Sequence, residues 1–319
     1  MKQHRQQSGA ALLTAMIIVS LIATMAAAMA WRQYRALHIE AAERARAQAL
    51  WILNGALDWA RLILREDARA NQQGEAVDHL GEVWAVPLAE ARLSTFLAAD
   101  QGGNADDGPE AFLSGALSDA QARYNLRNIV AATEQTLPVE QRTLARLCEM
   151  SGSPPDTAEL LSKQLRIAFS TKADGATAPL QPRTLDQLGW LGLTPDTIKR
   201  LRPFVDLLPR PTKVNLNTAP REVIAALFDG MDLASAERLV QVRQSQPLRK
   251  LEDAKAQLPE AVTVSADRAS VNSEFFVVTG RLRLEDRVLE ERSLVRRQGL
   301  DMLVQSRERV NLMLEAAGR

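Results

Sequence analysis

Few residues in this chain of 319 could carry out chemistry on a substrate. The sequence contains three histidines, His4, His38 and His79, and one cysteine, Cys148. A single cysteine excludes an intramolecular disulfide and a zinc site built from several thiolates. No nucleophile elbow, zinc-protease, P-loop or dinucleotide-binding motif occurs. Because no nucleophile–base pair can be assembled from these residues, we expect a protein that is not an enzyme.

One group of side chains has the chemistry of a metal site. Asp100, Asn104, Asp106 and Asp107 lie in a segment that also contains two adjacent glycines. Carboxylate and amide oxygens are hard donors that suit a hard cation, so these four residues form a candidate cation loop. The alternative is an ordinary acidic loop that is solvated and binds nothing.

Two segments have the pattern of helical hairpins, which in some proteins bind DNA. Residues 185–201 and 223–240 each read as a short helix, a glycine-containing turn and a second short helix. In DNA-binding hairpins the backbone N–H groups of the turn approach a phosphate. Here Asp229 and Asp232 flank the second turn and would repel a phosphate. Residues 183–255 carry 12 basic and 9 acidic side chains, and the whole chain carries 39 of each. We therefore expect structural hairpins and no nucleic-acid partner.

The element that positions the rest of the chain is an apolar helix at the N-terminus. Residues 10–31 contain no charged side chain over 22 positions. A helix of that length extends about 33 Å, enough to cross a bilayer core of about 30 Å. Lys2 and Arg5 favour a cytoplasmic N-terminus, which leaves the bulk of the chain in the periplasm. Small or apolar residues continue at helical spacing and predict one helix of about 55 residues.

The alternative for this segment is a signal peptide cleaved near residues 26–28. Its apolar run is longer than the 7–15 residues of a signal core, and the helical pattern continues beyond it. A short basic leader that ends in Gly9, directly before the apolar span, resembles a type IV prepilin N-terminus. The resemblance implies cleavage between Gly9 and Ala10 by a membrane peptidase, methylation of Ala10, and retention of the span.

The remaining sequence alternates between strand and helix patterns. Residues 71–110 are loop-like around a short helical stretch at 88–97, and residues 111–129 predict a strand and turn or a hairpin. Residues 137–258 look helical throughout, and two strand patterns follow at 275–284 and 288–295, with a short edge strand at 302–304. The simplest arrangement is one sheet interrupted by an inserted helical domain. The expected parts are a leader (1–9), a membrane span (10–31), a first sheet part (32–133), an all-helical insertion (134–268) and C-terminal strands (269–319).

Three further segments carry a wider resemblance: residues 51–61, residues 118–128, and residues 214–220 with the sequence Val-Asn-Leu-Asn-Thr-Ala-Pro. Together with the order of elements, they are similar to the general secretion pathway protein K family (GspK family). The resemblance implies an α+β, type IV pilin-like fold: a long N-terminal helix on an antiparallel sheet, with an inserted all-α domain of SAM-like, helix-hairpin-helix type. Some members are known to bind calcium in pilin-domain loops, and the resemblance makes Asp100, Asn104, Asp106 and Asp107 the candidate calcium loop here. Members lack the glutamate at mature position five, which matches Thr14 here.

The family consists of minor pseudopilins of type II secretion systems. The resemblance implies a subunit that caps the tip of the periplasmic pseudopilus and supports export of folded proteins across the outer membrane. Its expected partners are the other minor pseudopilins, the prepilin peptidase and the inner membrane, with contact to secretin or exoprotein. The alternative is a membrane-anchored DNA receptor of the competence type. Such a receptor would need one short basic domain after a linker, and no strands returning after the helices.

Overall fold

The computed structural model describes residues 8–72, 74–93, 111–170, 179–260, 262–284 and 287–313, without the side chains of 8–10, 287 and 310–313. The candidate calcium ligands Asp100, Asn104, Asp106 and Asp107 lie outside the described residues, so calcium binding there stays a prediction. The chain divides into two units, residues 1–54 and 55–319.

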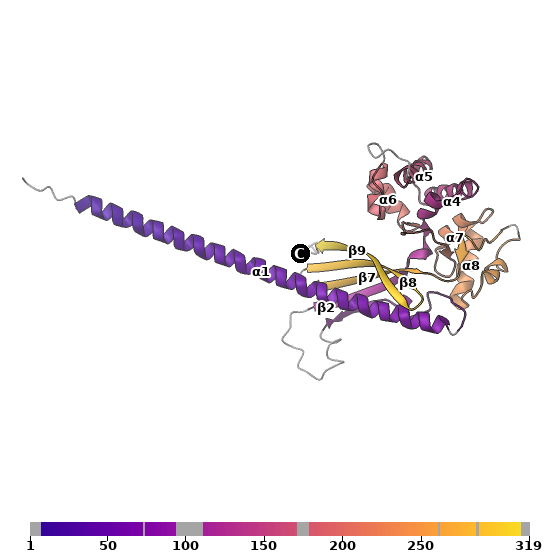
Figure 1. Ribbon diagram of the computed structural model, residues 1–319, viewed down its shortest axis with the longest axis horizontal. Helices are drawn as coiled ribbons and strands as arrows, with labels where there is room; N and C mark the ends of the chain where they lie inside the picture. The colour runs from indigo at the N-terminus through magenta and orange to yellow at the C-terminus, as the bar shows by residue number, and fades with distance from the viewer. Residues whose placement is uncertain are drawn as a thin grey trace, which may run out of the picture. The chain divides into compact units, whose positions relative to one another are not determined.

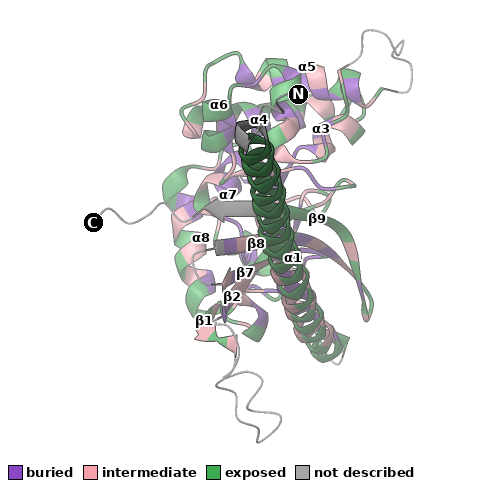
Figure 2. Cartoon of the chain, turned by 90° about the vertical axis from the view of Figure 1, so that its left-hand side faces the viewer, coloured by how far each residue is buried: buried purple, intermediate pink, exposed green. Residues whose placement is uncertain are grey.

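Helix α1 (Ser8–Gln72) is one uninterrupted helix of 65 residues, longer than the expected 55. Residues 11–44 are exposed on all sides in the first unit (Figure 2). Within the described part of the chain, α1 is the one helix long and apolar enough to cross a membrane. The Thr14 hydroxyl donates a hydrogen bond to the Ala11 carbonyl oxygen at 2.9 Å, so this polar side chain is satisfied within its own helix. The first unit therefore fits a single-pass membrane anchor.

The second unit contains a five-stranded antiparallel sheet in the order β1-β2-β7-β8-β9 (Figure 1). Strands β2 and β7 are neighbours in the sheet, paired from Ala111↔Leu284 to Asp119↔Phe276, although all the helical segments after β2 lie between them in sequence. This is the predicted topology of a sheet interrupted by helices, and the predicted α+β, pilin-like fold class is confirmed. The strands are β1 (Leu88–Arg92), β2 (Ala111–Asp119), β7 (Phe275–Leu284), β8 (Arg287–Gln298) and β9 (Asp301–Met313).

The last turns of α1 pack on one face of this sheet. Leu57, Ala60, Leu64 and Ala68, spaced three or four residues apart, are buried against Trp84 of the 3-10 helix η1 (Val83–Ala85) and against apolar residues of the sheet. From the same helix, the Arg61 and Arg65 side chains donate to carbonyl oxygens at the start of the β8–β9 hairpin, at 2.9 and 3.1 Å. Apolar burial and these charged donors together fix the helix to the sheet. The sheet residues in this core are Phe276, Val278, Val295 and Met302.

The helical part has a hydrophobic core of its own and gathers beyond one end of the sheet (Figure 1). Two short parallel strand pairs, β3 with β4 and β5 with β6, tie distant segments of it together. Thr194 caps α6 by accepting from the Thr197 N–H at 3.2 Å. The elements are η2 (Ala120–Ala122), β3 (Tyr124–Asn125), α3 (Arg127–Ala131), α4 (Leu137–Met150), α5 (Thr157–Ala168), η3 (Leu185–Leu191), α6 (Pro195–Leu201), β4 (Val205–Asp206), β5 (Val214–Asn215), α7 (Arg221–Leu227), α8 (Leu233–Ser245), α9 (Leu251–Lys255) and β6 (Ala269–Ser270).

Two local predictions were wrong, and a third was correct in type but covered too little of its strand. The described part of the expected helix at 88–97 is strand β1, because Leu88 to Arg92 pair with β2. The segment 137–258 is interrupted by β4 and β5. The expected edge strand at 302–304 is the 13-residue β9, which pairs with β8 along its length. In each case the structure is determined by pairing with a partner strand, which the local sequence propensity does not predict.

We predict that Leu64→Ala lowers the free energy of unfolding by about 2–5 kcal/mol, because Leu64 is fully buried between α1 and the sheet. The matched control is Leu62→Ala on the same helix, where the side chain is 48% exposed and the change should stay within about 0.5 kcal/mol. Urea unfolding of the detergent-solubilised chain measures both. Equal losses would show that α1 does not pack on the sheet through the Leu64 face.

Candidate functional site

Two of the segments that carry the sequence resemblance, residues 118–128 and 214–220, meet at a buried polar junction between the sheet and the helical part. Asp119 ends β2, Asn215 ends β5, Thr218 follows three residues later, and Ser273 precedes β7. Their exposed fractions are 3%, 0%, 7% and 3%. Four polar side chains buried together need hydrogen-bond partners, since an unpaired buried polar group costs about 1–3 kcal/mol.

The Asp119 carboxylate is the centre of this junction. Its Oδ2 accepts hydrogen bonds from Asn215 Nδ2 at 3.0 Å, Thr218 Oγ1 at 2.6 Å and Ser273 Oγ at 2.6 Å. Its Oδ1 accepts from the Gln121 N–H at 2.7 Å. Burial raises the pKa of the Asp119 carboxyl above its ordinary value, while the hydrogen bonds lower that pKa. One side chain thus joins three segments that are distant in sequence: 119–121, 215–218 and the residues before β7.

A second set of contacts joins the same junction to the end of α1. Asn215 Nδ2 donates to the Asp78 carbonyl oxygen at 3.0 Å, and the fully buried Asp78 carboxylate accepts from the Ser273 N–H at 2.6 Å. Arg297 of β8 forms an ion pair with Asp78 and another with Asp67 of α1, the latter at 2.6 Å. The junction therefore fastens the last turn of α1, β8 and the helical part to each other.

Other polar residues of the resemblance segments are also structural ties. Gln121 Oε1 accepts from the Glu274 N–H at 2.7 Å, and its Nε2 donates to the Lys213 carbonyl oxygen at 3.0 Å. Asn125 and Asn128 bind the segment after β4: Asn125 Nδ2 donates to the Arg210 carbonyl oxygen at 2.7 Å, and Asn128 Nδ2 to that of Thr212 at 2.9 Å. These segments hold the two parts of the unit together.

Asp67, Asp78 and Glu82 are the group of acids in the described part that could hold a metal, with one oxygen of each lying within 4.8 Å of the others. Arg297 already supplies positive charge to two of them. Burial, with the nearby charges of Glu82 and Asp78, raises the pKa of Asp67 to about 7 despite Arg297. Burial also raises the pKa of Glu82. The arrangement therefore holds a proton and a guanidinium near neutral pH, which is poor chemistry for a divalent cation.

The acids that flank the turn of the second hairpin serve the fold. Asp229 pairs with Arg142 at 2.8 Å and with Arg146 at 2.6 Å, and these hydrogen bonds lower the pKa of its carboxyl. Asp232 caps α8 by accepting from the Ser235 N–H at 2.6 Å. Gly230 takes a φ of +77° at the turn itself, a conformation that glycine adopts without strain. The hairpin is held to α4 by its acids.

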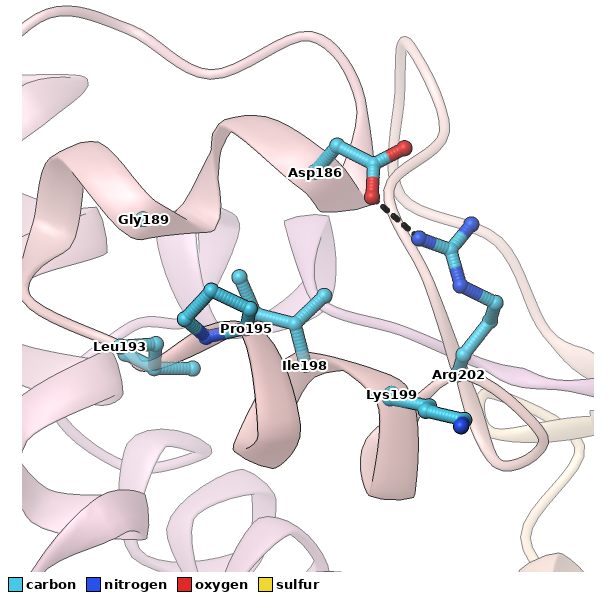
Figure 3. Close-up of a pocket in the computed structure, with 7 residues that line it drawn as sticks. All are labelled: Asp186, Gly189, Leu193, Pro195, Ile198, Lys199 and Arg202. Atoms are coloured by element: carbon cyan, nitrogen blue, oxygen red, sulfur yellow. Dashed lines mark hydrogen bonds and ion pairs between the residues drawn. The ribbon is translucent and has the colours of Figure 1, made fainter. Parts of the chain in front are cut away.

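The first hairpin carries a pocket of about 640 Å³ between η3 and α6 (Figure 3). Pro195 and Ile198 point from α6 toward η3, while the ion pair of Asp186 with Arg202 lies at one side. The lining residues are Asp186, Gly189, Leu193, Pro195, Ile198, Lys199 and Arg202.

The histidines and the cysteine, which the sequence offers as possible catalytic residues, do not lie together in the structure. Cys148 is buried in the helical core, and burial raises the pKa of its thiol to about 12, so the thiolate does not form at neutral pH. His79 lies beside the junction, with Nδ1 accepting from the Gly81 N–H at 3.1 Å. His38 stacks edge-on against Tyr34 in α1, and His4 lies outside the described residues.

Two sequence-predicted sites concern the start of α1. Gly9 and Ala10 lie within its first turns, and Thr14 lies one turn further along. Cleavage and methylation there stay predictions. Sequence reasoning missed the buried contributions of Asp67, Asp78, Ser273 and Arg297, because nothing in their spacing distinguishes them from surface residues.

Comparisons with known proteins agree with the resemblance found in the sequence. A family model described as type II secretion system, protein K, matches residues 214–278. A type II secretion system protein K from Pseudomonas aeruginosa is 27% identical over 304 residues, covering 89% of this chain and 87% of that protein. The one from Pectobacterium carotovorum is 28% identical over 334 residues, covering 95% and 96%.

A solved structure is also similar. The crystal structure of the GspK-GspI-GspJ complex from the type 2 secretion system of enterotoxigenic Escherichia coli contains a chain that aligns with a TM-score of 0.65 at 21% identity. The alignment covers 84% of this chain and 98% of that chain. The resemblance to type II secretion system protein K is confirmed, and it extends over nearly the full length of the relatives.

The raised pKa of Asp67 predicts a pH-dependent stability. A carboxyl whose folded pKa of about 7 exceeds its ordinary value of 3.8 binds a proton more tightly in the folded state. Stability therefore falls as pH rises from about 4 to about 7. Asp67→Asn removes this titration and keeps an oxygen that can accept from Arg297. Between about pH 4 and about pH 7, we expect the free energy of unfolding of the variant to fall by about 1–2 kcal/mol less than that of the parent, after allowance for solvent screening.

Urea unfolding at several pH values measures this difference. Glu82, Asp78, His79 and Arg297 face Asp67 and remain in both proteins, so their own titrations largely cancel in the comparison. Glu66→Gln, which removes an exposed carboxylate paired with Arg69 at 2.7 Å, is the matched control and should follow the parent. An Asp67→Asn profile parallel to that of the parent would contradict the prediction.

Proposed function

We propose that this chain is the protein K-type minor pseudopilin of a type II secretion system. In that role it caps the tip of the periplasmic pseudopilus and supports export of folded proteins across the outer membrane. The observation that carries the proposal is the sheet in which β2 and β7 are neighbours on either side of a large helical insertion. Full-length similarity to proteins named type II secretion system protein K supports it. The similar solved chain occurs in a complex with GspI and GspJ, which supports other minor pseudopilins as partners.

The N-terminal helix is the proposed membrane anchor. The prepilin peptidase cuts between Gly9 and Ala10, the new amine of Ala10 is methylated, and the span stays in the inner membrane. The N-terminus then lies on the cytoplasmic side and the second unit in the periplasm. The continuity of α1 from Ser8 to Gln72 supports retention of the span, because removal of a signal peptide would cut this helix in its middle.

Thr14 supports a position at the tip. In pilin-like fibres, the carboxylate usual at mature position five neutralises the N-terminal ammonium of a neighbouring subunit inside an apolar bundle. A buried carboxylate is costly unless it is paired, so a subunit with no neighbour ahead of it gains nothing from one. Thr14 is uncharged and bonds to the Ala11 carbonyl of its own helix. The bulk of the helical insertion also suits a cap better than a repeating position, and its surface is available for contact with secretin or exoprotein.

The helical insertion is the proposed separate domain, with bounds wider than the expected 134–268. Tyr124, Leu126 and Ile129 are fully buried in the helical core. We therefore place the start of the domain directly after η2 and its end just before β7. The competence-type DNA receptor is less favoured, because the strands β7 to β9 return after the helices to join the first sheet part.

The experiment that tests the function is co-purification with the other minor pseudopilins of the same bacterium. We expect a stable complex with one copy of each, and labelling of assembled pseudopili at the distal end only. Labels along the whole fibre would rule out the tip position. Failure to co-purify with any pseudopilin, together with salt-dependent binding of duplex DNA, would favour the receptor.

Processing gives a separate prediction. Mature protein from membranes should begin at a methylated Ala10, and Gly9→Trp should leave full-length precursor, because a bulky residue blocks the peptidase. Mass spectrometry of the N-terminal peptide reads both outcomes. Gln3→Trp in the same leader is the matched control and should be processed normally. A mature start near Ala27 would instead establish a cleaved signal peptide.

The domain bounds give another prediction. Joining Gln121 to Ser273 through a short glycine linker should leave a folded sheet on α1, because β2 and β7 already pair with each other. Circular dichroism should show loss of helix with strand signal kept. Deleting 134–268 instead leaves the apolar side chains of Tyr124, Leu126 and Ile129 without the core in which they are buried. This deletion should give a less stable protein. Collapse of the strand signal in the first deletion would mean that the two parts cannot fold separately.

A further inference from the structure

The pocket on the first hairpin lies apart from the junction, and two of its lining residues, Leu193 and Ile198, belong to the helical core. Its volume of about 640 Å³ lies within the range of ligand pockets, which is roughly 300–1,000 Å³. It lies between η3 and α6, which the left-handed turn at Gly192 connects (Figure 3). The hairpin is fixed by its own caps, so the pocket is present before any ligand arrives.

One half of the pocket is apolar. Leu193 and Ile198 form its base, and both are backed by the helical core, with exposed fractions of 6% and 5%. Pro195 adds an exposed apolar ring beside them. At Gly189 an added Cβ would meet no atom within 4 Å, so this wall opens on free space. The half-exposed Trp190, next in sequence, adds apolar surface at the rim.

The other half carries positive charge. Arg202 is paired with Asp186, and both side chains are substantially exposed. Lys199 lies on the same side of the apolar residues as Arg202 in Figure 3, and it has no ion-pair partner within the described part of the chain. The neighbouring Arg200 is paired elsewhere, with Asp196 at 2.9 Å. Two cations therefore face one carboxylate, and the pocket has an excess of one positive charge.

We propose that this pocket binds a peptide segment of another protein in which a large apolar side chain lies next to a carboxylate. The apolar side chain packs on Pro195 and Ile198. The carboxylate binds Lys199 and competes with Asp186 for Arg202, whose planar guanidinium suits carboxylate geometry. A carboxylate-bearing peptide uses both halves of the pocket. A nucleic-acid phosphate would leave the apolar half unused.

The test uses the full chain in detergent and a fluorescent peptide, Gly-Ser-Gly-Leu-Phe, with a free C-terminal carboxylate. Fluorescence polarisation at low salt should give a dissociation constant below about 1 mM, which is ordinary for one small pocket. The same peptide with a C-terminal amide should bind at least about fivefold more weakly, because it lacks the charge. Absence of binding at 5 mM peptide would overturn the proposal.

Three exposed positions make the test specific. Lys199→Glu should weaken binding about tenfold, whereas Lys163→Glu, an exposed lysine on α5, is the matched control and should not. Gly189→Leu should block the pocket by filling the open space at that wall. Asp186→Asn should tighten binding severalfold, because it removes the carboxylate that competes for Arg202. Unchanged circular dichroism spectra show that each variant is folded.

The opposite results are equally clear. Equal affinity for the carboxylate and amide peptides would reduce the pocket to an apolar contact and overturn the proposed ligand class. Weaker binding by Asp186→Asn would mean that Asp186 is itself a ligand for a positively charged group. Displacement of the peptide by a short DNA duplex would assign the hairpin to nucleic acid. These outcomes are independent of whether the chain assembles with pseudopilins.

Discussion

A carboxylate removed from water must receive hydrogen bonds from the protein, and the second unit is organised around the place where Asp119 receives them. Two hydroxyls, one amide and one backbone N–H bind its two oxygens. The donors come from three stretches of chain: Gln121, directly after Asp119 in sequence, Asn215 with Thr218, and Ser273. If any one of these stretches moved away, a buried acceptor would lose a partner at a cost of about 1–3 kcal/mol. The position of the helical part on the sheet is thus set by one side chain's need for donors.

Arg297 extends this constraint to the last part of α1. Its guanidinium binds the carboxylates of Asp67 on α1 and of Asp78 on the loop that follows, so two acids share one arginine. Burial and the nearby Glu82 and Asp78 carboxylates raise the pKa of Asp67 to about 7, although Arg297 opposes this shift. A buried ion pair adds little stability on balance, but breaking one is costly. Arg297 therefore fixes geometry more than it adds stability.

The sequence alone predicted the elements with a strong local signal. The apolar run of residues 10–31, the helical pattern that begins at residue 137, and the strand pattern of 275–284 all became the expected elements. Strands without such a signal were missed: β1 reads as helical, and charges such as Arg307 and Glu308 hide the strand character of β9. The junction could not be predicted from the sequence, for a different reason. Asp78 and Arg297 acquire their roles only because folding buries them together, and no local pattern encodes a contact between residues so far apart.

The adjacency of β2 and β7 also constrains how the chain can fold. Closing this pair directly would mean bringing together strand ends separated by about 150 unstructured residues, at an entropic cost of roughly 4 kcal/mol. The helical part can fold first from more local contacts, and its folded form already holds Gln121 beside Glu274. The two strands then meet as if joined by a short turn. The order of folding with the lowest entropic cost is therefore helices before sheet. Strand β2 then remains without its partner β7 until the whole insertion has been synthesised and has folded.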